Sequence, residues 1–343
     1  MTKALNTLYV TTQGAYVSKD HETIVVKAEE KQLIAVPMLA IGSLVCFGRV
    51  SVSPFLLGAC AERGIGISYL TENGRFLARV EGEISGNVLL RREQYRKADD
   101  PNAAREFARA FVAGKLANYR ASLRRYAREH TEPDKTQRLT FAAQSVQATL
   151  DNLPSAQSVD EVRGHEGEGS AAYFSAFDSA IHGEPGDFAF EKRSRRPPLN
   201  NLNALLSFLY VLVTHDCASA LQAVGLDPAV GFLHTDRPGR ASLALDLVEE
   251  FRPIWADRLA LSLINLKQIK TTGFSRTDSG AVNMDDETRK AVLVAYQKRK
   301  QEEVTHPFTE EKQTTGLLPH LQARLLARAI RGELDAYPPY VLK

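Results

Sequence analysis

The stretch TLYVTTQGAYVSKDHETIVVKAEEKQLIAVPMLAIGSLVCF, residues 7–47, decides the fold of the first part of the chain. It divides into short runs of β-branched and aromatic residues, which turn residues separate at close, regular spacing. That pattern is typical of an antiparallel sheet pair or sandwich rather than of alternating strands and helices. After it, Ser53 and Pro54 predict the start of a short helix that ends near Gly64, and the Asn-Gly pair at 73–74 predicts a hairpin turn.

Helical periodicity replaces this pattern from about Val88 and continues almost to the end of the chain. Pro101 predicts the start of a long helix, because proline is well suited to the first helical position. Ser158 and Glu161 form a capping-box pattern ahead of a second helix, and Ser242 is expected to cap a later one.

The 343-residue chain is long enough for two domains, so we expect an α+β protein. A β-sandwich-like N-terminal domain would comprise residues 1–84, and a larger, all-α C-terminal catalytic domain would comprise residues 85–343. The cysteines at 46, 60 and 217 lack the spacing of a zinc site, which predicts buried free thiols. Without a signal-like start or an apolar run of membrane-spanning length, we expect a cytoplasmic protein.

Two separated segments carry side chains suited to a divalent metal ion. Glu166 lies within the glycine-rich segment RGHEGEG, residues 163–169, and His234 follows an apolar run. Asp246 and Glu249 project from one face of a predicted helix because they are three residues apart. Carboxylate and imidazole donors suit Mg²⁺ or Mn²⁺, which support phosphoryl-transfer chemistry. The candidate catalytic residues are therefore Glu166, His234, Asp246 and Glu249.

Each of these residues also has a purely structural explanation. The glycines around Glu166 could serve tight helix packing, or the segment could be a loop. His234 could cap a core, and the carboxylates near Asp246 could pair with Arg240 or Arg252. The sequence alone leaves these alternatives open.

Basic residues gather on both sides of the glycine-rich segment. Residues 91–128 contain eleven bases against four acids, with three tyrosines among them. This stripe could follow a phosphate backbone and stack exposed bases, or it could be a solvated helix face. The run KRSRR at 192–196 could clamp a nucleic-acid strand, or form an ordinary surface loop. The predicted DNA-binding residues are Lys192, Arg193, Arg195, Arg196 and Arg240.

Three sets of short motifs stand in order along the chain: RGHEG with AAYF at 163–174, RRPP with NALLSF at 195–208, and GFLH with SLALDLVEEFRP at 231–253. No dinucleotide-binding, Walker, nucleophile-elbow or zinc-helix motif competes with them. Their content, order and spacing resemble the CRISPR-associated integrase family Cas1 over most of the chain. The resemblance is closest to the type I-C branch.

This resemblance implies a metal-dependent DNA endonuclease and integrase that inserts captured DNA as new spacers into a CRISPR array. It places the metal ligands at Glu166, His234 and Glu249, with Asp246 as an accessory carboxylate, and Mg²⁺ or Mn²⁺ as the ion. The implied partners are protospacer and leader-repeat DNA, a second copy that docks through residues 1–84, and the smaller protein Cas2. Two rival interpretations are a structure-specific repair nuclease without integration and a catalytically idle DNA-binding scaffold.

Overall fold

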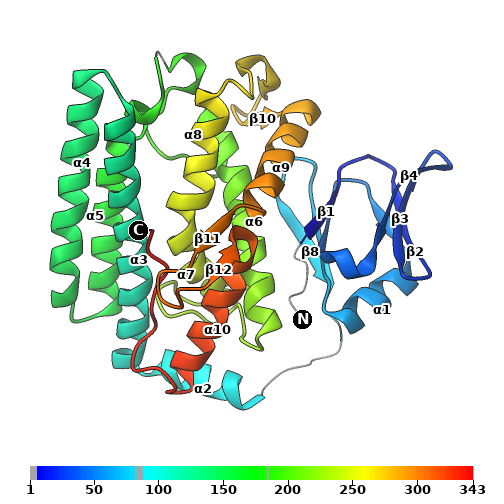
Figure 1. Cartoon of the computed structure of the whole chain (residues 1–343), viewed down its shortest axis with the longest axis horizontal. Helices are drawn as coiled ribbons and strands as arrows, with labels where there is room; N and C mark the ends of the chain where they lie inside the picture. The colour runs from blue at the N-terminus through cyan, green and yellow to red at the C-terminus, as the bar shows by residue number, and fades with distance from the viewer. Residues whose placement is uncertain (1–5, 81, 83–87, 184, 343) are drawn as a thin grey trace. The chain divides into compact units, whose positions relative to one another are not determined.

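The computed structural model describes residues 6–80, 82, 88–183 and 185–342. Contacts within the chain define two compact units. The β unit comprises residues 1–86 with 293–301, and the helical unit comprises residues 87–292 with 302–343. Figure 1 shows the elements of both units with the labels used below. Strands concentrate in the N-terminal region and helices in the remainder, which confirms the predicted α+β arrangement in this coarser form.

Two four-stranded sheets build the β unit. The first has the order β1-β5-β7-β8, with β1 Asn6–Val10, β5 Ile41–Phe47, β7 Gly66–Leu70 and β8 Phe76–Val80. The second has the order β4-β3-β2-β6, with β4 Lys31–Pro37, β3 Thr23–Ala28, β2 Tyr16–Asp20 and β6 Ser51–Val52. Buried residues of both sheets form one hydrophobic core together with helix α1, Pro54–Arg63.

The expected antiparallel pairing is wrong for three pairs of strands. β1 pairs with β5, β5 with β7, and β2 with β6, all in parallel. Parallel neighbours need a crossover connection, and α1 supplies one between β5 and β7. The sequence predicted α1 but did not reveal that it joins two neighbouring strands of one sheet. The predicted hairpin is confirmed, because β7 and β8 are antiparallel and Gly74 in their turn has a φ of 83°.

Short-range sequence signals set the ends of the predicted helices. The Ser53 hydroxyl accepts a hydrogen bond from the Leu56 amide at 3.2 Å, and Gly64 ends α1 in the left-handed conformation with φ 64°. Ser158 caps α5 in the same way, since its hydroxyl accepts from the Glu161 amide at 3.2 Å. Both caps were predicted, and both satisfy backbone donors that the first helical turn leaves free.

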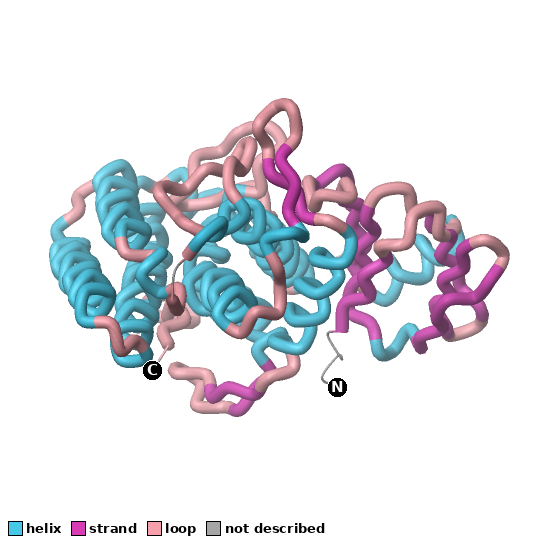
Figure 2. Tube along the Cα trace, turned by 90° about the horizontal axis from the view of Figure 1, so that it is seen from above, coloured by secondary structure: helices cyan, strands magenta, loops and turns pink. Residues whose placement is uncertain are grey.

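The helical unit is mostly helix (Figure 2). Its helices are α2 Val88–Asp99, α3 Pro101–Glu129, α4 Pro133–Asn152, α5 Val159–Ser175, α6 Asn201–Ala223, α7 Ser242–Phe251, α8 Arg258–Asn265, the first part of α9 Asp286–Lys300, and α10 Leu318–Ile330. A π-helical turn, η5 Arg252–Asp257, joins α7 to α8. Among the described residues, the short 3₁₀ turns are η1 Met38–Ala40, η2 Leu153–Ser155, η3 Asp178–Ala180, η4 Gly186–Phe188, η6 Thr271–Gly273 and η7 Thr315–Leu317.

Two short antiparallel ribbons also lie in the helical unit. β9 Phe274–Arg276 pairs with β10 Val282–Met284, and β11 Glu303–Thr305 pairs with β12 Lys312–Thr314. The expectation of an all-α second domain is therefore wrong in detail. Strands of three residues are too short for an alternating apolar pattern to be recognised among helices.

One cap expectation needs correction. Ser242 does not cap α7: it is the first helical residue, and its hydroxyl donates to the Thr235 carbonyl at 3.1 Å. By length and composition alone, α6 is long and apolar enough to cross a membrane. However, 67% of its most apolar window is buried inside the protein, as in the core helix of a folded domain.

The 29-residue helix α3 is central to the helical unit, because it packs against α2, α4, α5 and α7. In Figure 1, α3 lies beside α4 and α5. Several polar residues of α3, among them Lys115 and Asn118, are fully buried in these contacts. Buried polar groups need partners, and those of α3 come from the candidate site and the C-terminal segment.

Candidate active site

Glu166 lies in the interior of α5, with 27% of its side chain exposed. Ser170, one turn further along, donates a hydrogen bond to Glu166 Oε1 at 2.9 Å. The neighbouring glycines differ: a Cβ at Gly169 would come within 2.2 Å of Leu116, whereas a Cβ at Gly164 would meet nothing within 4 Å. Tight helix packing therefore explains Gly169 but not Gly164, which leaves the backbone on that side of Glu166 accessible.

Asp246 fixes the loop that carries His234. Its carboxylate oxygens accept hydrogen bonds from the backbone amides of Phe232, Leu233 and His234 at 2.6, 3.0 and 2.9 Å. The same carboxylate lies 2.7 Å from His234 Nδ1. A Cβ at Gly231 would approach Asp246 Oδ2 to 2.8 Å, so this loop requires glycine there. Asp246 thereby orients the imidazole ring and leaves Nε2 turned toward the site.

Glu249 is buried at the centre of these contacts, with 2% of its side chain exposed. His234 Nε2 lies 3.8 Å from Glu249 Oε1, Lys115 Nζ lies 2.8 Å from Oε2, and Arg252 pairs with Oε1. Burial by itself would raise the pKa of Glu249. The charges of Arg252, Lys115 and His234 outweigh burial and lower the pKa to about 2. Glu249 is therefore a carboxylate at neutral pH.

Lys115 of α3 joins the two carboxylates that lie far apart in the sequence. Its ammonium group donates to Glu166 Oε1 and pairs with Glu249 Oε2 at 2.8 Å, and 2% of its side chain is exposed. In the sequence, Lys115 stands only as one base of the stripe 91–128. The missed signal was its place on the apolar face of α3 that also carries buried Phe111, since a lysine there needs an acidic partner.

The four predicted catalytic residues meet in the structure. Glu166 comes from α5, His234 from the loop before α7, and Asp246 and Glu249 from α7. Within the described residues, no group of three or more His, Cys, Asp or Glu side chains is arranged to hold a metal ion. The ammonium group of Lys115 lies between Glu166 and Glu249 instead. Two carboxylates and an imidazole are nevertheless donor types that suit Mg²⁺ or Mn²⁺.

Arg193 points into the interior, which the sequence did not predict. Its guanidinium group donates to Asn203 Oδ1 at 2.7 Å and to Ser207 Oγ at 3.0 Å. It also lies 5.1 Å from the ring centroid of Tyr210, at the same distance as Arg252. Arg193 therefore holds its basic segment to α6 and, through Tyr210, contributes to the packing behind Arg252.

The other predicted DNA-binding residues lie nearer to solvent. Lys192, Arg195 and Arg196 are exposed, and Arg240 is half-buried. Partial burial and the neighbouring charge of Arg237, with a smaller contribution from Arg196, lower the pKa of Arg240. Like charges gathered in this way are relieved by an anionic ligand such as a phosphate group.

The tyrosines of the basic stripe are not free to stack bases as one interpretation expected. Tyr119 and Tyr126 are buried, and Tyr119 stacks on Tyr173 with ring centroids 3.8 Å apart. Tyr95 is 37% exposed, but its hydroxyl donates to the Asp227 carboxylate at 2.8 Å. The base-stacking interpretation is wrong for Tyr119 and Tyr126, because α3 is surrounded by other helices and its aromatic rings fill the core.

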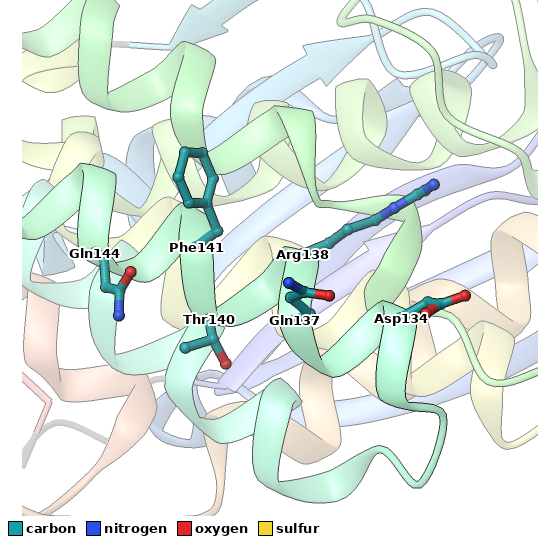
Figure 3. Close-up of a pocket in the computed structure, with 6 residues that line it drawn as sticks. All are labelled: Asp134, Gln137, Arg138, Thr140, Phe141 and Gln144. Carbon is teal, nitrogen blue, oxygen red and sulfur yellow. The ribbon is translucent and has the colours of Figure 1, made fainter.

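A cavity of about 620 Å³ lies on α4, and none of the predicted site residues lines it (Figure 3). Its lining comes from one helix, and Phe141 in it is 70% exposed. The lining residues are Asp134, Gln137, Arg138, Thr140, Phe141 and Gln144. A surface made by one helix lacks the convergent polar groups of a catalytic centre, so the cavity is not part of the candidate site.

Comparison with known proteins identifies the family. A family model described as CRISPR associated protein Cas1 matches residues 8–298. The chain belongs to the Cas1 family. The sequence resemblance is confirmed at this level.

Relatives of known name match the chain over its whole length. A protein of Chlorobaculum tepidum named CRISPR-associated endonuclease Cas1 1 is 51% identical over 341 residues, 99% of each chain. A protein of Rhodospirillum rubrum named CRISPR-associated endonuclease Cas1 2 is 51% identical over 353 residues, 100% of each chain. These names give no subtype, so the type I-C assignment stays a prediction.

Solved structures share the fold. A CAS1 protein from Thermotoga maritima matches with TM-score 0.82 and 24% identity, over 96% of this chain and 97% of that one. A casposase bound to integration product matches with TM-score 0.82 and 22% identity, over 97% and 93%. The Cas1 fold, with strands first and a mostly helical remainder, is thus confirmed.

Proposed function

We propose that this chain is a metal-dependent DNA endonuclease and integrase that inserts new spacer DNA into a CRISPR array. One observation carries the proposal: the Lys115 ammonium group joins Glu166 to Glu249, and His234 Nε2 lies 3.8 Å from Glu249 Oε1, in a chain of the Cas1 family. The names of the relatives at 51% identity, which are endonucleases, support it. We infer the type I-C branch from the motifs alone.

The residues of the proposed site have different roles. Glu166, His234 and Glu249 would hold Mg²⁺ or Mn²⁺, which supplies Lewis-acid polarisation of a phosphodiester and a lower pKa for an attacking hydroxyl. Asp246 keeps His234 Nε2 directed into the site, because its carboxylate holds the Nδ1 side of the ring. Arg252, paired with Glu249, adds positive charge where a phosphate would gain negative charge.

The reaction exchanges one phosphodiester for another. The 3′-oxygen of the incoming DNA forms a bond to a target phosphorus and releases its proton to solvent. The bond between that phosphorus and the target 3′-oxygen breaks, and the leaving oxygen takes up a proton. Because the bonds formed and broken are alike, no nucleotide cofactor is needed. With water as the nucleophile, the same residues perform endonucleolytic cleavage.

We propose that DNA passes over the exposed bases near this site. Lys192, Arg195, Arg196 and Arg240 supply cationic side chains that neutralise phosphates without reading sequence. Arg193 is assigned to holding this segment in place, because both of its Nη nitrogens donate to side chains of α6. Protospacer and leader-repeat DNA are the proposed substrates, and a cytoplasmic location follows from them.

The proposed partners are a second copy of the chain and Cas2. In the β unit, Leu39 and Phe55 are 84% and 86% exposed, and Leu33 of the edge strand β4 is 51% exposed. Such exposed apolar side chains on one unit favour a docking surface for another protein. We assign this surface to the homodimer and infer Cas2 from family membership.

Strand transfer of a labelled 3′-hydroxyl DNA into a supercoiled target tests the proposal. Glu166→Ala and His234→Ala are each expected to lower the yield of joined product at least ~10²-fold, with DNA binding retained. The matched control is Glu168→Ala on the same helix, where the side chain is 65% exposed and makes none of these contacts with Lys115. We expect this control to retain strand transfer.

The same assay separates the rival functions. Cleavage without joined product would favour a repair nuclease. No product with either Mg²⁺ or Mn²⁺ would favour a DNA-binding scaffold. Full activity of the Glu166→Ala or His234→Ala variant would remove the site assignment.

A further inference from the structure

Lys115 is a buried lysine that three helices enclose at the candidate site. It extends from α3 and contacts Glu166 of α5 and Glu249 of α7, with 2% of its side chain exposed. Burying an ammonium group without partners would be strongly unfavourable, and two carboxylates are what compensate it here. Burial lowers the pKa of Lys115, but Glu249 and Glu166 outweigh this and raise it, so the group is charged.

The ammonium group faces the carboxylate oxygens that a divalent ion would need. Glu249 has both oxygens in contact with cations, Lys115 at Oε2 and Arg252 at Oε1. Lys115 also contacts Glu166 Oε1, and Ser170 donates to the same oxygen. A divalent ion cannot bind both carboxylates while the ammonium group stays between them, because the two cations would repel each other at contact distance.

We propose that Lys115 occupies the cation position between Glu166 and Glu249 in the metal-free protein and is displaced when the divalent ion binds. This inference rests on the proposed function, because it assumes that these carboxylates are metal ligands. Lys115 is then a positioning residue that keeps the ligands assembled without metal and competes with the ion for them. The wild-type protein should therefore bind metal more weakly than a variant that keeps the three ligands but lacks the charge of Lys115.

The structure offers a place for the displaced ammonium group. The ring of Tyr119, one turn along α3, has its centroid 5.4 Å from Lys115 Nζ. An aromatic face attracts a cation, so a change of side-chain rotamer could transfer the ammonium group from the carboxylates toward this ring. Exchange of partners inside the site would keep Lys115 charged and buried.

Mn²⁺ affinity, measured by calorimetry on the full chain without DNA, tests the inference. Lys115→Met removes the competing charge and should bind Mn²⁺ at least about tenfold more tightly than wild type. Lys115→Arg keeps the charge and should bind as weakly as wild type. Lys300→Met is the matched control, because Lys300 is also a buried lysine but contacts Thr7 and Tyr296 in the β unit. Its Mn²⁺ affinity should equal that of wild type.

The possible outcomes separate this inference from the proposed function. If Lys115→Met binds Mn²⁺ as wild type does or more weakly, while wild type performs strand transfer, the inference about Lys115 is wrong and the function stands. If neither protein binds Mn²⁺ and neither joins DNA, both proposals are wrong.

A second measurement avoids the risk that Lys115→Met does not fold. In the wild-type protein, the Nζ resonance of Lys115, assigned with the Lys115→Arg variant, should shift when Mg²⁺ is added. The resonance of Lys300 should not move. A Lys115 resonance that stays unchanged at Mg²⁺ concentrations that support strand transfer would overturn the proposed displacement.

Discussion

Two neighbouring glutamates of α7, Glu249 and Glu250, are both buried but face different surroundings. Glu249 is paired with Lys115 and Arg252, and these charges lower its pKa to about 2. Burial raises the pKa of Glu250 to about 8, although hydrogen bonds from Tyr337 and other donors oppose the shift. Of two identical side chains on one helix, Glu249 is therefore negatively charged at neutral pH and Glu250 is mainly neutral, because one has cations beside it and the other has neutral donors.

The face of α7 that carries Glu250 binds the C-terminal segment. Tyr337 donates to Glu250 Oε1 at 2.6 Å, and the Tyr340 amide donates to Oε2 at 2.7 Å. Asn118 of α3 donates to the carbonyls of Glu250 and Tyr340 at 2.9 and 2.8 Å and accepts from the Leu342 amide at 2.7 Å. The C-terminal segment thus ties α3 to α7 behind the site, and the other face of α7 presents Glu249.

The largest expected effect tests whether only one face of α7 carries the chemistry. Glu249→Gln removes the charge that holds Lys115 and Arg252, together with a proposed metal ligand. Strand transfer should fall at least ~10²-fold. Glu250→Gln is the matched control, because glutamine resembles a protonated glutamate and contacts no proposed ligand side chain. Equal losses of strand transfer in the two variants would contradict the prediction that only the Glu249 face of α7 takes part in the chemistry.

The next effect is the dependence of stability on pH. The folded pKa of Glu250 is raised from 4.5 to about 8, so the folded protein holds this proton more tightly than the unfolded chain. Its contribution is complete below the unfolded pKa and is lost as pH rises through the folded pKa. Between about pH 5 and 8, the free energy of unfolding of wild type should fall by up to ~1.4 kcal/mol per pH unit relative to Glu250→Gln.

Urea denaturation of both proteins at several pH values measures this difference. The contribution of Glu249 to stability changes with pH in the opposite direction. Its pKa is lowered on folding, so its contribution is present above the unfolded pKa of 4.5 and is lost as pH falls through about 2. Parallel stability curves for wild type and Glu250→Gln from pH 5 to 8 would show that Glu250 is ionised in the folded protein.

Much of this arrangement was readable in the sequence because its signals are local. The caps at Ser53 and Ser158 and the hairpin at 73–74 each depend on a few consecutive residues. The ligand candidates Glu166 and Glu249 were identified because they interrupt a glycine-rich and an apolar segment. A charged side chain in such a segment is unfavourable unless it has a structural or functional role.

The missed features depend on contacts between distant segments. Parallel strand pairing was not predicted, because it is set by how α1 crosses between β5 and β7 and not by the strands' own residues. Lys115 and Arg193 were grouped with surface bases, because a count of charges does not show which bases are buried. Lys115 contacts two carboxylates, and Arg193 donates to a side chain of α6. Glu250 was not distinguished from Glu249, because its partners lie at the far end of the chain.

The smallest expected effect concerns the hydrogen bond from Tyr337 to Glu250. Tyr337→Phe removes only the hydroxyl and keeps the ring against Phe111, whose centroid is 5.1 Å away. One acceptor of Glu250 then loses its donor inside the core, which should lower the free energy of unfolding by ~1–2 kcal/mol. Tyr16→Phe, at a side chain that is 47% exposed in the β unit, is the control, with an expected change below ~0.5 kcal/mol.

Strand transfer by Tyr337→Phe should stay within about threefold of wild type, because the contacts of Glu249 with Lys115 and Arg252 do not involve this hydroxyl. The C-terminal segment would then support α7 without taking part in the chemistry. A loss of strand transfer as large as that of Glu249→Gln, in a variant that is still folded, would instead mean that the hydrogen bonds of Glu250 set the position of Glu249. The two faces of α7 would then act as one site.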